Sequence, residues 1–237
     1  NLASDEDQVG DAERGHTSEQ VAYWVFETDT GFDIHNAGGT VIGEGGKVSS
    51  MGASSATYSF RNSYTNPVVV TVPNLNSASD APAVTRISAT TATSFTAQIQ
   101  RPGGGAAPTS RDVYYLVFEQ GAHTLPGGIS MEAGTQSISG QNGKTAGWSN
   151  TQMVKLTPLN TYTTPVVLGQ VMTTNDPLWS AFWTSNGTQG SVPNASNIYV
   201  GIHVGEDSTT ARATEDVGYV IVEKGTGVTN SINWEAS

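Results

Sequence analysis

The sequence contains no cysteine, so no disulfide bond contributes to its stability. Charged residues make up only 13%, with 10 basic against 21 acidic, and the formal net charge is -11. So few Lys and Arg leave no basic surface to neutralise phosphates, which argues against nucleic acids and anionic membranes as partners. No apolar run approaches the roughly 20 residues that span a bilayer. Asn1 does not open a secretion signal, so we expect a mature chain or a fragment.

Helical periodicity is also missing, because no window of a dozen residues repeats its apolar positions every 3.6 residues. The chain is instead rich in Gly (27 residues), Ser, Thr and Asn, a composition typical of short strands joined by tight turns. We expect an all-β protein with little helix. A β-rich chain without thiols suits an oxidising environment, which favours an extracellular or cell-surface location.

Two stretches of sequence occur more than once. SYTNPVVV (63–70) returns as TYTTPVVL (161–168), and RDVYYLVFEQG (111–121) returns as EDVGYVIVEKG (215–225) and, earlier, as EQVAYWVFETD (19–29). A Gly-containing loop and a third motif follow each closing strand, in the forms VIGEGG (41–46), ISMEAG (129–134) and INWEAS (232–237). Internal repeats of this kind indicate modules of one fold.

The repeats divide the chain into two complete units, 45–133 and 134–237, preceded by the closing half of a third unit at 1–44 with a strand at about 20–27. Residues 85–100 read as two strands around a polar turn, with Ile87, Phe95, Ala97 and Ile99 on the inward side. Turn signals every eight to twelve residues are typical of an antiparallel β-sandwich. The sequence therefore predicts two tandem antiparallel β-sandwiches after an incomplete repeat.

The order of these motifs resembles the H-type lectin module, the small β-sandwich of snail agglutinin and of the discoidin C-terminal domain, here as the tandem modules of secreted bacterial proteins. The resemblance rests on Phe60, Tyr64 and the ranges 67–70, 84–88, 90–99 and 113–117. It implies a module that binds sugars such as N-acetylgalactosamine in shallow sites between the subunits of a trimer. The sugar contacts of that family are an acidic residue, an arginine and an aromatic residue paired with histidine, and neither unit carries the whole set.

Sugar rings stack on aromatic planes, and their hydroxyls pair with planar donors and acceptors. The segment NDPLWSAFW (175–183) offers two tryptophans next to such groups. The candidate carbohydrate-binding residues from this segment are Trp179, Trp183, Asn175 and Asp176, and the resemblance to the lectin module adds Arg86 and His203. The alternative interpretation is that both tryptophans pack in the core, as most large aromatic side chains do.

The acidic segment near the N-terminus is a candidate Ca²⁺ site, because closely spaced carboxylates are the ligands that Ca²⁺ prefers. Its candidate ligands are Asp5, Glu6, Asp7 and Asp11. Their spacing is not that of an EF-hand loop, and a solvated acidic face is the alternative.

The sequence contains no recognisable catalytic motif. The four histidines lack a neighbouring nucleophile in a recognisable turn, and His123, close to Gly121, is expected in a loop. The recurring Glu27, Glu119 and Glu223 each end a closing strand, which suggests a turn or a contact between units in which they bind backbone N–H groups. We therefore expect no enzyme.

Three functions remain open. The first is a non-catalytic extracellular region that binds glycans and serves adhesion. The second is a structural subunit or stalk of a surface fibre, a homo-oligomer in which Val21, Tyr23 and Val25 of the half repeat pair with a neighbouring copy, since an isolated apolar strand must find a sheet. The third is an accessory region of a secreted hydrolase.

Overall fold

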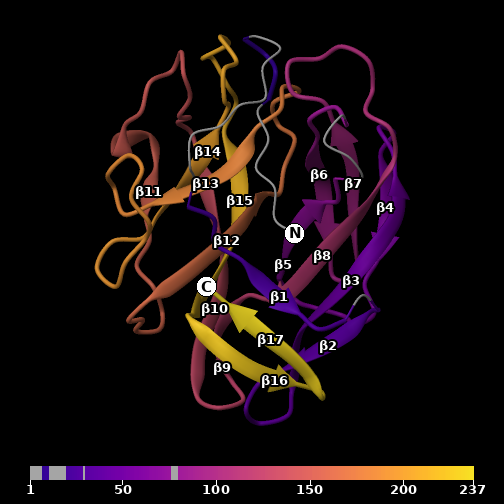
Figure 1. Ribbon diagram of the computed structural model, residues 1–237, viewed down its shortest axis with the longest axis vertical. Coiled ribbons are helices and arrows are strands. Elements are labelled where there is room, and N and C mark those ends of the chain that lie inside the picture. The colour runs from indigo at the N-terminus through magenta and orange to yellow at the C-terminus, as the bar shows by residue number, and fades with distance from the viewer. Residues whose placement is uncertain (1–6, 11–19, 29, 76–79) are drawn as a thin grey trace.

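The computed structural model describes residues 7–10, 20–28, 30–75 and 80–237, and they form an all-β protein. One turn of 3₁₀ helix, η1 (Asn150–Gln152), is the helical element among them. None of the described helices has the length and apolar character to cross a membrane. The fold consists of two antiparallel β-sandwiches of two sheets each and one further sheet (Figure 1). We call this further sheet the third sheet, because it is the third one built from the repeated closing strand. The predicted all-β class with two tandem sandwiches is confirmed.

The first sandwich consists of two antiparallel sheets. Its inner sheet has the strand order β2 (Phe32–His35), β3 (Val41–Met51), β8 (Arg111–Glu119) and β5 (Pro67–Pro73). Its outer sheet has the order β4 (Ala56–Ser59), β7 (Ser94–Gln100) and β6 (Val84–Thr91). The predicted hairpin is the β6–β7 pair, and the four residues expected to point inward are fully buried.

The second sandwich repeats this arrangement. Its inner sheet has the order β9 (Gly121–Leu125), β10 (Ile129–Ile138), β15 (Glu215–Glu223) and β12 (Pro165–Val171). Its outer sheet has the order β11 (Val154–Lys155), β14 (Tyr199–His203) and β13 (Ala181–Ser185). Positions 45 and 134, where the sequence repeats begin, fall inside the continuous strands β3 and β10.

The third sheet corresponds to part of an inner sheet. It has the order β1 (Trp24–Phe26), β17 (Ile232–Ala236) and β16 (Gly225–Thr229), so a strand from the start of the chain pairs with one from its end (Figure 1). Its register repeats that of the two inner sheets. In each sheet the glutamate of the third repeated motif lies opposite a β-branched residue at the equivalent position of the closing strand, and the three pairs are Glu44 and Val117, Glu132 and Ile221, and Glu235 and Val25.

One apolar cluster joins the third sheet and the first sandwich to the inner sheet of the second sandwich, whose interior forms a separate cluster. The ring of Trp24 on β1 stacks on Phe118 of β8, with centroids 5.4 Å apart, and meets Trp234 of β17 edge-on at 5.6 Å. Buried residues of β12 and β15 belong to the same cluster. Burying these large rings stabilises the contact between distant strands, because a buried aromatic side chain removes roughly 150–250 Å² of surface from water.

The two sandwiches also contact each other through their inner sheets. A Cβ atom at Gly218 of β15 would lie 2.9 Å from Val68 of β5 and 2.3 Å from Met172, so only glycine fits this close approach. Next to it, the Thr71 hydroxyl donates to Gln170 Oε1 at 2.7 Å, and Gln170 Nε2 donates to the Thr85 carbonyl at 3.0 Å. We call this contact between the sandwiches the seam.

Candidate functional site

The six residues predicted to bind sugar lie in two separate groups. Arg86, Asn175, Asp176 and Trp179 lie at the seam, where β6 of the first sandwich meets the loop after β12 of the second. Trp183 and His203 lie on the outer sheet of the second sandwich, on β13 and β14. The sequence could not separate these groups, because the seam joins segments that are distant along the chain.

Arg86 links the two sandwiches through buried polar contacts. Its Nη2 donates to the Asp176 carbonyl at 2.8 Å, and its Nη1 donates to the Leu178 carbonyl. The carboxylate of Glu215 lies 3.7 Å from the same Nη2, and both side chains are almost fully buried. Burial lowers the pKa of Arg86, while the negative charges of Glu215 and Asp176 act in the opposite direction.

Arg212 extends this ion pair into a network that the sequence analysis missed. Its Nη2 lies 3.0 Å from Asp207 and its Nη1 3.8 Å from Asp176, and its buried guanidinium also donates to the Trp179 carbonyl at 2.9 Å. The backbone N–H groups of Asn175 and Asp176 donate to Glu215. Because protein groups occupy the oxygens of these carboxylates, the network holds the seam together.

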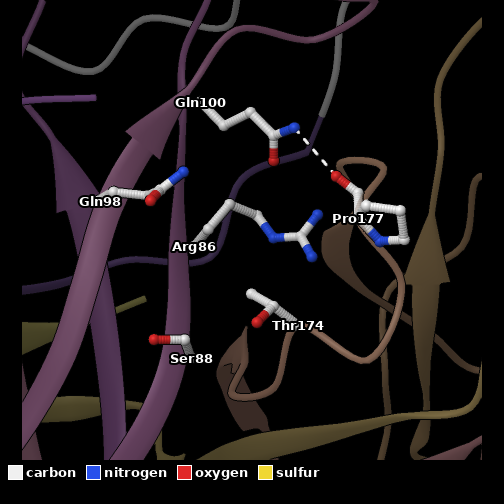
Figure 2. A pocket seen from close by; sticks show the side chains of 6 residues that line it. All are labelled: Arg86, Ser88, Gln98, Gln100, Thr174 and Pro177. Atoms are coloured by element: carbon white, nitrogen blue, oxygen red, sulfur yellow. Dashed lines mark hydrogen bonds between the residues drawn. The ribbon is translucent and has the colours of Figure 1, made fainter. Parts of the chain in front are cut away.

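A polar pocket of about 190 Å³ opens beside Arg86 at the seam (Figure 2). We call it the seam pocket, and its lining residues are Arg86, Ser88, Gln98, Gln100, Thr174 and Pro177. Figure 2 shows Gln98, Gln100 and Arg86 on one side and Thr174 and Pro177 on the other, with Gln100 Nε2 donating to the Pro177 carbonyl at 3.2 Å.

The chemistry of the seam pocket is that of hydrogen bonding. Two primary amides, two hydroxyls and one guanidinium line it. None of these groups changes its protonation state near neutral pH. The amides and hydroxyls can pair with hydroxyl or carbonyl groups of a ligand, whereas both Nη atoms of the guanidinium already donate to backbone carbonyls. The two amide side chains could have been found from the sequence, because the residues of β7 alternate between the two faces. Ala97 and Ile99 enter the core, so Gln98 and Gln100 point away from it.

Trp183 and His203 form a half-buried aromatic group together with Trp148. The Trp183 ring meets His203 edge-on at 5.3 Å and Trp148 at 6.3 Å. Trp179 is buried, as the packing interpretation expected, whereas Trp183 remains partly exposed. The aromatic group is thus a second candidate surface, separate from the seam pocket.

The predicted metal ligands lie mostly outside the described residues, since Asp5, Glu6 and Asp11 do so. Asp7 accepts hydrogen bonds from the backbone N–H groups of Val9, at 2.9 Å, and Glu206, at 2.8 Å. In the part of the chain that the structure describes, no three His, Cys, Asp or Glu side chains are grouped so that they could hold a metal ion.

Two of the three recurring glutamates bind backbone N–H groups, as the sequence suggested, whereas Glu27 accepts a hydrogen bond from the Asn233 side chain. Glu119 accepts from Thr65 and Asn66, and Glu223 accepts from the corresponding Thr163 and Thr164. His123, expected in a loop, lies in β9 opposite Met131. The tight turn after Leu125 begins later than the sequence indicated, which extends the strand over His123.

Tyr23 and Val25 of the predicted pairing strand lie against β17 of the same chain, where Val25 is opposite Glu235 and the Tyr23 backbone exchanges two hydrogen bonds with Ser237. Val21, which precedes β1, and Val25 are exposed.

Comparison of the chain with family models, with curated proteins and with solved structures found no match.

Proposed function

We propose that this chain is a non-catalytic carbohydrate-binding region that serves adhesion at a cell surface or outside the cell, with the seam pocket as its glycan site. The observation that carries the proposal is the lining of this pocket by Arg86, Gln98 and Gln100 together with the hydroxyls of Ser88 and Thr174. Planar amide groups donate to and accept from the adjacent hydroxyls of a sugar ring, and the buried Arg86 guanidinium, held by the Asp176 and Leu178 carbonyls, forms the wall behind them.

The size of the seam pocket favours one sugar residue over an extended oligosaccharide. Its volume of about 190 Å³ lies below the roughly 300–1,000 Å³ of pockets that enclose drug-sized ligands. A single ring can fill it while the rest of a glycan extends into solvent, which is the geometry of a terminal-sugar site.

Charge favours a neutral sugar. The chain carries a formal charge of -11, and the Arg86 guanidinium is already paired with Glu215. A sulfated or sialylated glycan would meet a repulsive field without a free cation to offset it. Neutral hexoses and N-acetylhexosamines, whose acetamido group can pair with an amide side chain, are the expected ligand class.

A glycan array followed by titration calorimetry tests this function. We expect binding of neutral glycans by the intact chain and at least a tenfold loss of affinity in Gln98→Ala. Gln136→Ala on β10, outside the pocket, is the matched control and keeps full affinity. Absence of any glycan ligand contradicts the proposal, and loss of binding in Trp183→Ala with retention in Gln98→Ala would move the site to the aromatic group.

A further inference from the structure

The third sheet presents an apolar face that is buried in both sandwiches. Val21 is 53% exposed and Val25 is 51% exposed, whereas their counterparts in the repeated sequence are fully buried. Those counterparts are Val113 and Val117 on β8 and Val217 and Ile221 on β15. Tyr23, between the two valines, lies on the same face because side chains alternate along a strand.

Two elements cover this face in the sandwiches. An outer sheet packs over it, and an antiparallel strand pairs with the edge, β5 on β8 and β12 on β15. Within the described ranges, β1 is an edge strand whose one partner is β17. An unpaired edge next to an exposed apolar face is a template for strand addition.

The glutamate that closes the strand keeps the same position in all three sheets. Glu119 on β8 accepts two consecutive backbone N–H groups, those of Thr65 at 2.6 Å and Asn66 at 2.8 Å, just before β5 begins. Glu223 does the same for Thr163 at 2.6 Å and Thr164 at 2.7 Å. The corresponding Glu27 is exposed and accepts from the Asn233 side chain at 2.6 Å.

A second glutamate, on the partner strand, also repeats. Buried Glu44 accepts from the N–H groups of Arg61 and Asn62 and from the Tyr64 hydroxyl at 3.1 Å. Glu132 makes the same contacts with residues 159 and 160 and with the hydroxyl of Tyr162.

The third member of this set is Glu235, which is exposed and accepts a hydrogen bond from the Tyr23 hydroxyl at 2.7 Å. The third sheet thus carries both carboxylates that bind an incoming strand elsewhere in the molecule.

We propose that the free edge of β1 is an acceptor site for an extended segment of another polypeptide with the pattern Tyr-Thr-x-Pro-Val-Val. That pattern is what the two occupied edges share, as YTNPVV (64–69) and YTTPVV (162–167). By the common register, its Pro lies opposite Glu27 and its two Val opposite Phe26 and Val25. The Pro position needs no ladder N–H, because it begins the strand.

The occupant is not a strand of a second folded copy of this chain. Both copies of the pattern in this chain are already paired, and their Val side chains are buried in β5 and β12. A second copy would have to unfold one of its sandwiches to donate either strand. The site is independent of glycan binding, since none of its residues lines the seam pocket.

Fluorescence anisotropy with a labelled peptide of residues 62–73 (NSYTNPVVVTVP) tests this acceptor site on the intact chain. We expect saturable binding that weakens at least tenfold in Val25→Asp and several-fold in Glu27→Gln. Val228→Asp on β16, which is 48% exposed, is the matched control and binds the peptide like the unchanged chain. Both Val positions are exposed, so the variants are expected to keep the elution volume and circular dichroism of the parent.

Hydrogen exchange supplies a second readout, because peptide binding should slow exchange of the Trp24 and Phe26 amides. A peptide with the same composition in scrambled order should neither bind nor protect. The proposal is overturned if the ordered peptide does not saturate, if the scrambled peptide binds as well, if Val25→Asp has no effect, or if the chain forms a dimer that the peptide does not displace.

Discussion

At the scale of single residues, the three equivalent glutamates on β3, β10 and β17 show how surroundings decide what a side chain contributes. Glu44 and Glu132 are buried and accept several hydrogen bonds each, whereas Glu235 is exposed. Replacing Glu132 with Gln exchanges the charged acceptor at Oε2 for a neutral one and puts a buried N–H₂ at the Oε1 position, which has no hydrogen-bond partner among the described residues. We expect Glu132→Gln to lower the free energy of unfolding by about 2–3 kcal/mol in denaturant titrations.

The matched control for that prediction is Glu235→Gln. Its carboxylate lies at the surface, so we expect the free energy of unfolding to change by less than about 0.5 kcal/mol. Equal losses in the two variants would show that the shared sequence motif, and not the buried hydrogen bonds, sets the stability.

Two buried tyrosines make the stability depend on pH at the alkaline end. Burial, and then the nearby charge of Glu44 or Glu132, raises the pKa of Tyr64 and of Tyr162 well above the usual value of about 10. The unfolded chain therefore loses these protons at a lower pH than the folded chain. Their stabilising contribution is complete below about pH 10 and declines as the pH rises further.

Denaturant unfolding at pH 8 and pH 11 checks this sign. We expect a lower free energy of unfolding at pH 11, and a smaller drop in the double variant Tyr64→Phe, Tyr162→Phe, which has no hydroxyl to ionise at either position. An equal drop in the double variant would assign the pH dependence to other groups.

At the scale of elements, the strands that follow local patterns could be predicted from the sequence and the long-range pairings could not. The alternation of apolar and polar residues predicts the β6–β7 hairpin, and runs of β-branched and aromatic residues predict the closing strands. The pairing of β1 with β17 joins residues more than two hundred positions apart, and no local signal marks it. The structure shows that β17 stands in the register of β3 and β10, so the third repeated motif corresponds to a strand that pairs with the closing strand.

The same distinction applies to the candidate site. The sequence identified Arg86 and Asp176 as candidates by residue type, but Ser88 and Thr174 are ordinary surface positions until the seam brings them together. Trp179 and Trp183 share parity in the sequence, yet the loop before β13 buries only the first. A sequence shows the chemical type of each side chain, but it does not show which side chains the packing of the two sandwiches brings together in one pocket.

The contact of β15 with β5 leads to a prediction at this scale. Gly218→Ala places a methyl group within 2.9 Å of Val68 and 2.3 Å of Met172, so the sandwiches must shift apart. We expect a loss of about 1–3 kcal/mol from overpacking in the free energy of unfolding. Gly225→Ala is the control, because its nearest neighbour, Ile129, would lie at 3.6 Å; a similar loss there would contradict the explanation.

At the scale of the whole molecule, the shared core and the buried ion network make one body of the two sandwiches and the third sheet. Arg86→Met removes the guanidinium that joins them and leaves Glu215 buried. We expect a loss of about 3–5 kcal/mol in the free energy of unfolding. Arg61→Met removes a partly exposed pair with Asp33 and should cost less than about 1 kcal/mol.

Calorimetry can compare these variants with the parent chain. We expect a single main transition for the parent, because β12 and β15 contribute buried residues both to the cluster shared with the first sandwich and to the separate cluster inside the second sandwich. Two well-separated transitions in the parent chain would show that the sandwiches unfold independently and that the seam contributes little.

The central claim is that the chain closes on itself, with β1 on β17, to form a third sheet equivalent to the two inner sheets. Val25→Cys with Glu235→Cys tests it most directly, since the chain has no other cysteine and directly opposed residues of an antiparallel pair lie within the roughly 4.4–6.8 Å that a disulfide spans. Oxidation should give a fast-migrating monomer on a non-reducing gel, while Val25→Cys with Val228→Cys should stay reduced. Free thiols or only intermolecular dimers in the first variant would contradict the claim.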